Sequence, residues 1–570
     1  MSDHNVLFCT FNIQYSNLRP SLRREIFKFK EDVGQDNFAR MTSGNNFSNI
    51  FAQETSLPQK AGLFFSNLKK VIHKSFRKVR IVNGGKQKNE AKSQIQIMMD
   101  KRKELKLFLK SCTCKALSAR VRSELNLIEQ FIGNTKGEGK AKIVASHVKG
   151  VEDNGGNLSH IKLWDLKKKL CPQQGDPPMA KRDELGNLIS APEALKSLYA
   201  RTYSRRLRSR EMSQNLMDVY ILKEELWSSR LKCLSNVKSE EWSLNKLINV
   251  LKQLKNNKLA DPNLMINEIF KEGFAGQDLQ NSLLLLFNGI KNSSHIPSFL
   301  SNQDICTIFK KKGSRLDMKN DRGIFILTSL RRILDKLLYN DLYDDIDRNM
   351  SDCNIGARKG RQVKNHLFII HSIINSVING KNDPIDIQFY DLEQAFDALW
   401  LTDCMNDVFD TLPSDKRDDR LSLLFTSSIE NNVAVRTPYG LTERMLIPKI
   451  VKQGGTWGPV LCSNSIDVIG KKVWSSGQHC YLYRNSVRIL PLAMVDDICT
   501  ISKCGLESLK WNSYINTHAE LKKLRFHVPD QNGRSKCHKL HIGCKSRFAP
   551  NYKFMAQKWE RLILMITLVM

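Results

Sequence analysis

The stretch Ile385-Asp386-Ile387-Gln388-Phe389-Tyr390-Asp391 places an apolar side chain at every second position and ends on an acid. A period of two is the side-chain period of a β-strand, so the apolar row and the terminal aspartate would share one face. A second stretch, residues 489–501, holds two apolar runs on either side of the pair Asp496-Asp497. This arrangement is typical of a hairpin with an acidic turn. The sequence therefore predicts strand ends that offer three aspartates.

Three carboxylates in one sheet carry a high electrostatic cost unless cations neutralise them. Mg²⁺ prefers one or two protein carboxylates and leaves room for substrate phosphates, and a pair of such ions can clamp the oxygens of a phosphoryl transfer. An Asp-Asp turn can also be merely solvated, and an aspartate after a strand often caps the following helix. The pattern favours a nucleotidyl transferase, and the surrounding motifs decide between these alternatives.

Several motifs surround the three acids in a fixed order. They are Lys258-Leu259-Ala260-Asp261-Pro262, Lys310-Lys311-Lys312-Gly313, Asn320-Asp321-Arg322-Gly323-Ile324, Gly356-Ala357-Arg358-Lys359-Gly360-Arg361, Asp391 with Phe396-Asp397, Gln453-Gly454-Gly455, Asp496-Asp497, and Leu521–Phe526 with Lys536-Cys537. In this order they resemble the fingers and palm motifs of reverse transcriptases, and more narrowly those of the non-LTR (LINE-type) retrotransposons. The resemblance covers about residues 245 to 545.

The resemblance implies an α+β fold, with the fingers and palm of a right-hand polymerase after a mostly helical region. It also implies an RNA-directed DNA polymerase, in which a primer 3′-hydroxyl attacks the α-phosphorus of a dNTP on an RNA template. Two Mg²⁺ ions would assist, with Mn²⁺ as a substitute. The alternative is a polymerase-dead retroelement remnant that only binds RNA or DNA. A telomerase or an intron maturase fits the beginning of the chain less well.

The resemblance assigns roles to individual residues of the acid-bearing site. Asp391, Asp496 and Asp497 would hold the metal ions, together with the carbonyl oxygen of Leu392. Lys536 would protonate the pyrophosphate leaving group, although Lys522 and Lys523 compete for this role.

The resemblance also assigns nucleotide contacts. Arg322 and one of Lys310 to Lys312 would neutralise the triphosphate, and Gln453 with Gly454 would lie along the nucleotide. Phe396 would be the steric gate that excludes a ribose 2′-hydroxyl. A structural alternative remains for each, because a lysine run is usually a solvated loop and Phe396 with Trp400 is also a helix face in a core.

Some residues depart from the family pattern. Met494 stands where an aromatic residue is usual, and Val495 follows it where this branch usually has alanine. Asp321 replaces a tyrosine, and Trp457-Gly458-Pro459 replaces a commoner Ser-Pro ending. We interpret these differences as subfamily variation.

The charge balance predicts a polyanionic partner. The chain holds 89 Lys and Arg against 58 Asp and Glu, a formal net charge of +31, as expected for nucleic-acid binding. The predicted contact residues are Arg358, Lys359, Arg361, Arg205, Arg206 and Arg208. Such clusters can also be solvated helix faces or nuclear-import patches, as can the second cluster around Lys69–Arg80. A membrane is the rival partner, but no long apolar span, lipidation signal or secretory leader is present.

The cysteines predict an intracellular protein. Fourteen cysteines without a signal peptide indicate reduced thiols, in the nucleus or the cytoplasm rather than in a secreted protein. The group Cys537, His538, His541 and Cys544 does not have the spacing of a zinc knuckle, so we do not expect zinc there.

The predicted organisation has five parts. Residues 1–15 resemble the last strand of an apurinic-type endonuclease, with Ser2-Asp3-His4 as a relic. A basic, mostly helical linker covers 16–240 and includes a helical hairpin at 91–132. The fingers would cover 241–382, the palm 383–545, and a truncated or frame-shifted tail 546–570.

Overall fold

A computed structural model describes residues 24–81 and 180–543, together with a few single positions between 102 and 129. Gaps within these ranges fall at 28, 30–31, 77, 208–213, 259, 311–312, 394, 430, 448–450, 477–480, 485, 504–505, 523 and 527–536. The chain separates into two compact units, one of residues 1–23 and 82–177 and the other of residues 24–81 and 178–570. The second unit contains every element described below. The predicted endonuclease relic, the helical hairpin at 91–132 and the tail at 546–570 lie essentially outside the described residues.

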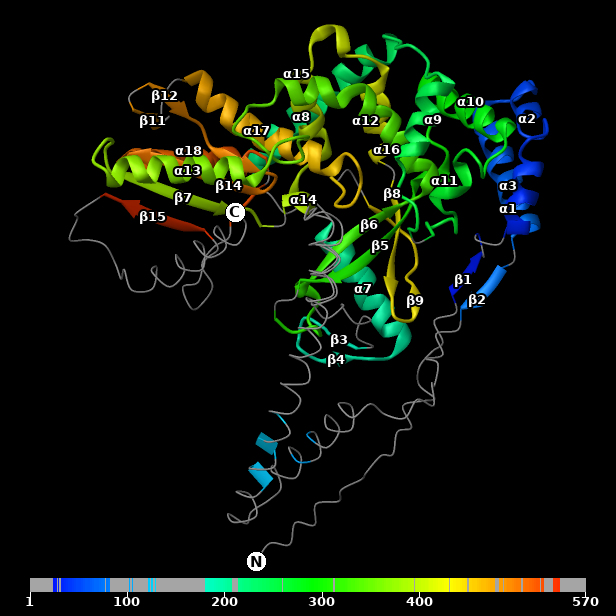
Figure 1. Ribbon diagram of the computed structural model, residues 1–570, viewed down its shortest axis with the longest axis horizontal. Coiled ribbons are helices and arrows are strands. Elements are labelled where there is room, and N and C mark those ends of the chain that lie inside the picture. The colour runs from blue at the N-terminus through cyan, green and yellow to red at the C-terminus, as the bar shows by residue number, and fades with distance from the viewer. Residues whose placement is uncertain are drawn as a thin grey trace, which may run out of the picture. The chain divides into compact units, whose positions relative to one another are not determined.

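The acid-bearing stretches form one antiparallel sheet of four strands in the order β13-β14-β7-β15 (Figure 1). Its strands are β7 (Ile385–Asp391), β13 (Leu492–Met494), β14 (Asp497–Lys503) and β15 (His538–Ile542). Strand β7 is central, because β14 pairs with one of its edges and β15 with the other. The predicted strand at 385–391 is thus confirmed, with the bounds expected from its alternation.

Helices cover both faces of this sheet, so β7 buries its polar row as well as its apolar row. Ile385 and Ile387 pack in a core with helix α13 (Val363–Ile378). On the other face lies helix α18 (Leu506–Glu520), where the Gln388 amide donates to Ser508 Oγ at 2.6 Å. Such hydrogen bonds make the burial of polar strand residues tolerable.

A second sheet has the order β10-β8-β5-β6, with β9 paired to β8. The strands are β5 (Asn302–Phe309), β6 (Asp321–Leu327), β8 (Asn431–Thr437), β9 (Gly440–Leu441) and β10 (Met445–Ile447). Strands β5 and β8 are parallel, and the other pairs are antiparallel. Helix α7 (Pro192–Arg206) covers this sheet through Leu195, Leu198 and Tyr199.

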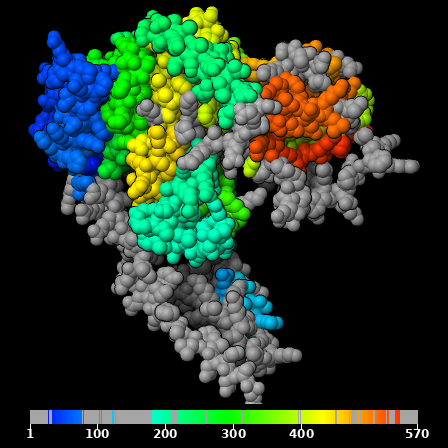
Figure 2. Space-filling model, turned by 180° about the vertical axis from the view of Figure 1, so that it is seen from behind, coloured from blue at the N-terminus to red at the C-terminus, as the bar shows by residue number. Residues whose placement is uncertain are grey.

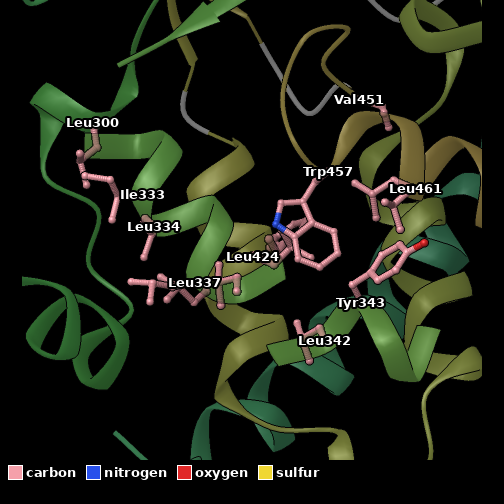
Figure 3. Close-up of a cluster of buried hydrophobic side chains, with 14 of the residues drawn as sticks. Leu300, Ile333, Leu334, Leu337, Leu342, Tyr343, Leu424, Val451, Trp457 and Leu461 are labelled. Atoms are coloured by element: carbon pink, nitrogen blue, oxygen red, sulfur yellow. The ribbon is translucent and has the colours of Figure 1, made fainter. Parts of the chain in front are cut away.

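A helical core lies between the two sheets and buries the largest apolar cluster. Its helices are α8 (Gln214–Asn236), α9 (Leu244–Gln253), α10 (Gln277–Ser293), α12 (Ser329–Asn349), α15 (Leu401–Thr411), α16 (Asp419–Ile429) and α17 (Gly458–Ser476). Figure 3 shows Trp457 directed into this cluster, toward α12 residues such as Leu337 and Leu342. Helix α8 of the predicted linker packs on α15 and α16, and the boundary near residue 241 stays a prediction.

The N-terminal helices α1 (Asp32–Met41), α2 (Ser48–Ala52) and α3 (Leu57–Ser75) pack beside α10 (Figures 1 and 2). Backbone amides of Phe47 and Ser48 donate to the Asp278 carboxylate at 2.8 and 3.0 Å. This segment of the predicted linker therefore belongs to the same compact unit as the rest.

The remaining elements are short. They are β1 (Arg24–Phe27), β2 (Lys78–Ile81), β3 (Lys181–Arg182), β4 (Leu188–Ile189), η1 (Asn267–Phe270), α11 (Ser298–Ser301), η2 (Met318–Asn320), α14 (Ala395–Ala398), η3 (Ser414–Lys416), β11 (Tyr481–Tyr483) and β12 (Val487–Ile489). The helices among the described residues include none long and apolar enough to cross a membrane.

Candidate active site

The strand register brings the acid-bearing segments together. Asp391, the last residue of β7, is the direct cross-strand partner of Asp497, the first residue of β14. Directly opposed residues of antiparallel strands have Cα atoms about 4.5–5.5 Å apart. Asp496 immediately precedes Asp497, so all three aspartates lie at one end of the sheet. Among the described residues, no three His, Cys, Asp or Glu side chains already form a metal-binding group, so the metal site stays a prediction.

The turn before Asp497 differs from the predicted Asp-Asp turn in one respect. Met494 pairs with Asp497, so the two turn residues are Val495 and Asp496. Val495 has φ of +59°, a conformation that β-branched residues rarely adopt and that glycine usually supplies in such hairpins. Backbone strain of this kind persists only where the surroundings hold it in place.

Residues 353–356 pack against the turn and hold its backbone in place. The Ile355 and Ala493 amides donate to the carbonyls of Ala493 and Cys353, both at 2.9 Å. Gly356 lies so close to the turn that a Cβ atom there would be 2.3 Å from the Val495 nitrogen. Ser463 Oγ of helix α17 donates to the Gly356 carbonyl at 2.8 Å. The close packing of Gly356 against the Val495 backbone was not predicted from the sequence.

Gly356→Ala should therefore displace the Asp496-bearing turn. We expect the free energy of unfolding to fall by about 1–3 kcal/mol. Any reaction that depends on the three aspartates should slow by about 10²-fold, because catalytic groups tolerate little displacement. Gly470→Ala is the matched control, since a Cβ there meets nothing within 4 Å and alanine favours a helix. Urea unfolding and primer extension by both variants measure the two effects. Equal activity in the two variants would contradict the supporting role.

The turn Gln453-Gly454-Gly455 packs against strand β6 of the second sheet. The Phe325 amide of β6 donates to the Gln453 carbonyl at 2.8 Å. Gly454 has φ of +118°, and a Cβ there would lie 2.6 Å from the Phe325 carbonyl oxygen. Both the backbone conformation and the close approach require glycine. This predicted nucleotide-contact segment is thus fixed against the strand that carries Arg322.

Phe396 lies on the short helix α14, directly after the acid at the end of β7. Its ring is half-buried and packs against the helical core, and it faces Gly458, where a Cβ would lie 3.8 Å from the ring. Leu392 forms a backbone bridge to Phe526. The two segments predicted for the gate and for the glycine turn are therefore neighbours.

Lys310 and Arg322 lie on one hairpin of the second sheet. Ile308 is the cross-strand partner of Arg322, and the Lys310 amide donates to the Asn320 carbonyl at 2.8 Å. Both side chains are exposed, as a triphosphate contact requires. Lys311 and Lys312 lie outside the described residues.

Two arginines predicted to bind nucleic acid make internal contacts instead. The Arg358 guanidinium is buried and donates to Asp347 Oδ1 at 2.8 Å and to three backbone carbonyls. Arg206 donates to the Asp321 and Met318 carbonyls. These contacts give both arginines a structural role, and their predicted contact with nucleic acid stays a prediction.

The other predicted contact residues are placed differently. Lys359 and Arg361 are exposed, and each forms a surface ion pair, with Asp344 and Asp352 respectively. Arg205 forms an exposed ion pair with Glu184. These three remain candidates for nucleic-acid contact, and Arg208 lies outside the described residues.

Asp321, which departs from the family pattern, has a local explanation. Its carboxylate is buried and forms an ion pair with Lys181 Nζ at 2.5 Å. The Lys181 ammonium also donates to the Arg315 carbonyl at 2.7 Å. This ion pair connects strand β3 to the hairpin that carries Arg322. The burial of Tyr199, together with the nearby charge of Asp321, raises the pKa of the Tyr199 hydroxyl.

Of the three lysines considered for the leaving-group acid, Lys522 is excluded by its surroundings. Its buried ammonium lies 2.5 Å from Asp407 Oδ2 and 3.4 Å from Asp403 Oδ2. Burial alone would lower the pKa of Lys522, but these two carboxylates outweigh burial and raise it. Lys536 and Lys523 lie outside the described residues. Cys537, next to Lys536, has its thiol 3.4 Å from the Asp391 amide, so this part of the chain borders the acid site.

A small pocket of about 20 Å³ lies behind the glycine turn. Residues from α12, from the turn and from the start of α17 line it, among them Arg331, Asp335, Lys452, Gly455 and Trp457. Two of its lining donors, Lys452 Nζ and Trp457 Nε1, are buried without a hydrogen-bond partner. Sequence reasoning did not single out Lys452.

Comparisons with known proteins give a partial relationship. No family model matches the chain. Over 122 residues, 21% of the chain, it is 26% identical to the RNA-directed DNA polymerase from mobile element jockey of Drosophila funebris. The matched stretch spans 13% of that polymerase's length. Among solved structures, apo telomerase from Candida tropicalis, truncated from its C-terminal domain, matches 44% of this chain and 51% of its own, with a TM-score of 0.30 and 13% identity. Part of the chain is thus similar to a mobile-element reverse transcriptase.

Proposed function

We propose that this protein is an RNA-directed DNA polymerase of the non-LTR retrotransposon type. The observation that carries the proposal is the direct pairing of Asp391 with Asp497, with Asp496 in the adjoining turn. The sheet that bears them would be the palm. The second sheet, with Lys310 and Arg322, would belong to the fingers. The similarity to the jockey polymerase supports the proposed reaction.

The donor set fits magnesium. Three carboxylates from two neighbouring strand ends are hard oxygen ligands, and the Leu392 carbonyl follows directly after Asp391. Two bound Mg²⁺ ions would neutralise charge on the reacting phosphate and orient the primer hydroxyl. The chain's own contribution is to hold the three aspartates at one sheet end, fixed by the turn over Gly356.

The neighbouring segments would position the nucleotide. Arg322 and Lys310 would contact the triphosphate from the exposed face of their hairpin. The turn Gln453-Gly454-Gly455, held against β6, would lie along the nucleotide. Lys359, Arg361 and Arg205 would contact the nucleic-acid backbone through their exposed charges.

Primer extension by the full chain tests the proposal. We expect a DNA primer annealed to an RNA template to be extended with dNTPs and Mg²⁺, and the reaction to stop when EDTA is added. The alternative, a polymerase-dead remnant, predicts RNA binding without extension. Binding measured in the same preparation separates inactivity from misfolding, and its affinity should fall steeply with salt, since each phosphate contact adds about 0.7–0.9 to the log-log slope.

Phe396→Ala tests the steric gate. Removing the ring opens space next to Gly458, so incorporation of rNTPs relative to dNTPs should rise roughly 10–200-fold, the range expected when a pocket gains or loses a small group. Phe409→Ala is the control, because Phe409 is partly buried in the same core but packs against Arg230 and Arg417. It should lower stability and leave sugar selection unchanged. Unaltered selection in Phe396→Ala would return Phe396 to a core role.

A further inference from the structure

Basic side chains outnumber acidic ones in the lining of the pocket behind the glycine turn. Arg331 and Lys452 line it on the cationic side, and Asp335 is its acidic residue. The Arg331 guanidinium donates to Asp335 Oδ1 at 2.7 Å and to Ser427 Oγ at 2.9 Å. The carboxylate is therefore already paired with Arg331, and Lys452 has no counter-charge of its own.

Lys452 and Trp457 each place an N–H donor in this region without a hydrogen-bond partner. Lys452 is 7% exposed and Trp457 is 4% exposed, and neither Nζ nor Nε1 has an acceptor. A buried polar group without a partner destabilises the folded protein, and a buried charge does so more strongly. Burial and the neighbouring Arg331 lower the pKa of Lys452 well below its usual value. Without an acceptor the Lys452 amine is therefore pushed toward its neutral form, whereas an anion beside it would favour the ammonium and accept its hydrogen bond.

The size of the pocket limits what that acceptor can be. A volume of about 20 Å³ exceeds the ≳ 10–15 Å³ that one water molecule needs, and it is too small for a nucleotide. We propose that this pocket binds a small anion, either a free halide such as chloride or the anionic oxygen of a phosphate group, between Lys452 Nζ and Trp457 Nε1. The halide case stands without the proposed polymerase function, whereas the phosphate case rests on it.

The place of the pocket gives the anion an effect on the candidate active site. Lys452 directly precedes Gln453, and a Cβ at Gly458 would lie 2.0 Å from the Lys452 carbonyl oxygen. Gly455, Trp457 and Gly458 form part of the pocket wall. An anion held by Lys452 and Trp457 would therefore fix both ends of the glycine turn at once.

The first arm of the test measures thermal unfolding of the full chain while chloride replaces gluconate at constant ionic strength. We expect the Tm of the wild-type chain to rise with chloride by an amount on the order of 5 °C when the site is filled. Lys452→Met should have a higher Tm than wild type in gluconate, because the uncompensated amine is gone, and should not respond to chloride. Trp457→Phe should respond less than wild type. Lys252→Met, at a surface ion pair with Glu272, should respond as wild type does.

The second arm identifies the source of the anion. RNA affinity is measured in gluconate and in chloride at equal ionic strength, for wild type and Lys452→Met. If a phosphate group occupies the pocket, chloride weakens RNA binding by wild type, and Lys452→Met binds RNA more weakly and without that difference. If the ligand is a free halide, chloride raises the Tm but RNA affinity is equal in both proteins. The proposal would be overturned if wild type and Lys452→Met showed the same response of Tm to chloride and the same RNA affinity. The pocket would then hold only water. Absent primer extension with a chloride response retained would instead count against the polymerase alone.

Discussion

Asp496→Asn is expected to lower Mg²⁺-dependent primer extension by roughly 10²–10³-fold, the scale seen when one electrostatic contact to a reacting group is lost. The substitution keeps the size of the side chain and removes its charge, at the turn that adjoins the paired Asp391 and Asp497. Because Asp496 lies in a turn and not in the core, the free energy of unfolding should change little. Extension assays measure the activity. Circular dichroism and RNA binding show whether the variant keeps its secondary structure and its affinity for RNA.

Asp415→Asn is the matched control for this prediction. Asp415 is exposed on the short helix η3, so the same chemical change there should leave extension intact. If Asp496→Asn also loses RNA binding and secondary structure, the defect is one of folding. If it extends primers as wild type does, the proposed metal site is wrong.

Lys522→Met is expected to lower the free energy of unfolding by about 3–5 kcal/mol, because it leaves the buried Asp407 carboxylate without its cation. Asp403 and Asp407 both contact the Lys522 ammonium, and Lys223 Nζ lies 2.9 Å from Asp403 Oδ1. Lys510→Met, at an exposed position of the preceding helix α18, should change stability by no more than about 0.5 kcal/mol. Urea unfolding of both variants gives the comparison.

A double variant and the pH dependence refine this prediction. Lys522→Met combined with Asp407→Leu should recover part of the loss, since an apolar pair of similar volume can replace a buried ion pair. The pKa of Lys522 is raised in the folded protein, so its contribution is fully present below the pKa of the unfolded chain. It is lost only as pH rises through the higher folded value. A Lys522-dependent loss of stability as pH rises through neutrality, rather than through the alkaline range, would contradict this account.

The sequence by itself determined the two acid-bearing strands and their neighbourhood. The alternation of Ile385–Asp391 predicted β7 with its bounds, and the apolar runs around Asp496 predicted the hairpin of β13 and β14. Such patterns are local, because the strand period and the two-residue turn are properties of adjacent residues. The mixture of helices and sheets that the structure has was expected from the resemblance to reverse transcriptases.

Only the tertiary structure decided which charged side chains face inward. Arg358, Lys522 and Asp321 look like surface residues in the sequence, yet each is buried against a partner from a distant or separate element: Asp347, Asp407 and Lys181. Likewise Gly356 gains its role from contact with Val495, far along the chain. The local sequence does not distinguish a charged side chain that is solvated from one that is buried in an ion pair. Which of the two occurs depends on whether packing brings an opposite charge within reach. That information lies in the contacts between elements and not in the pattern of any one of them.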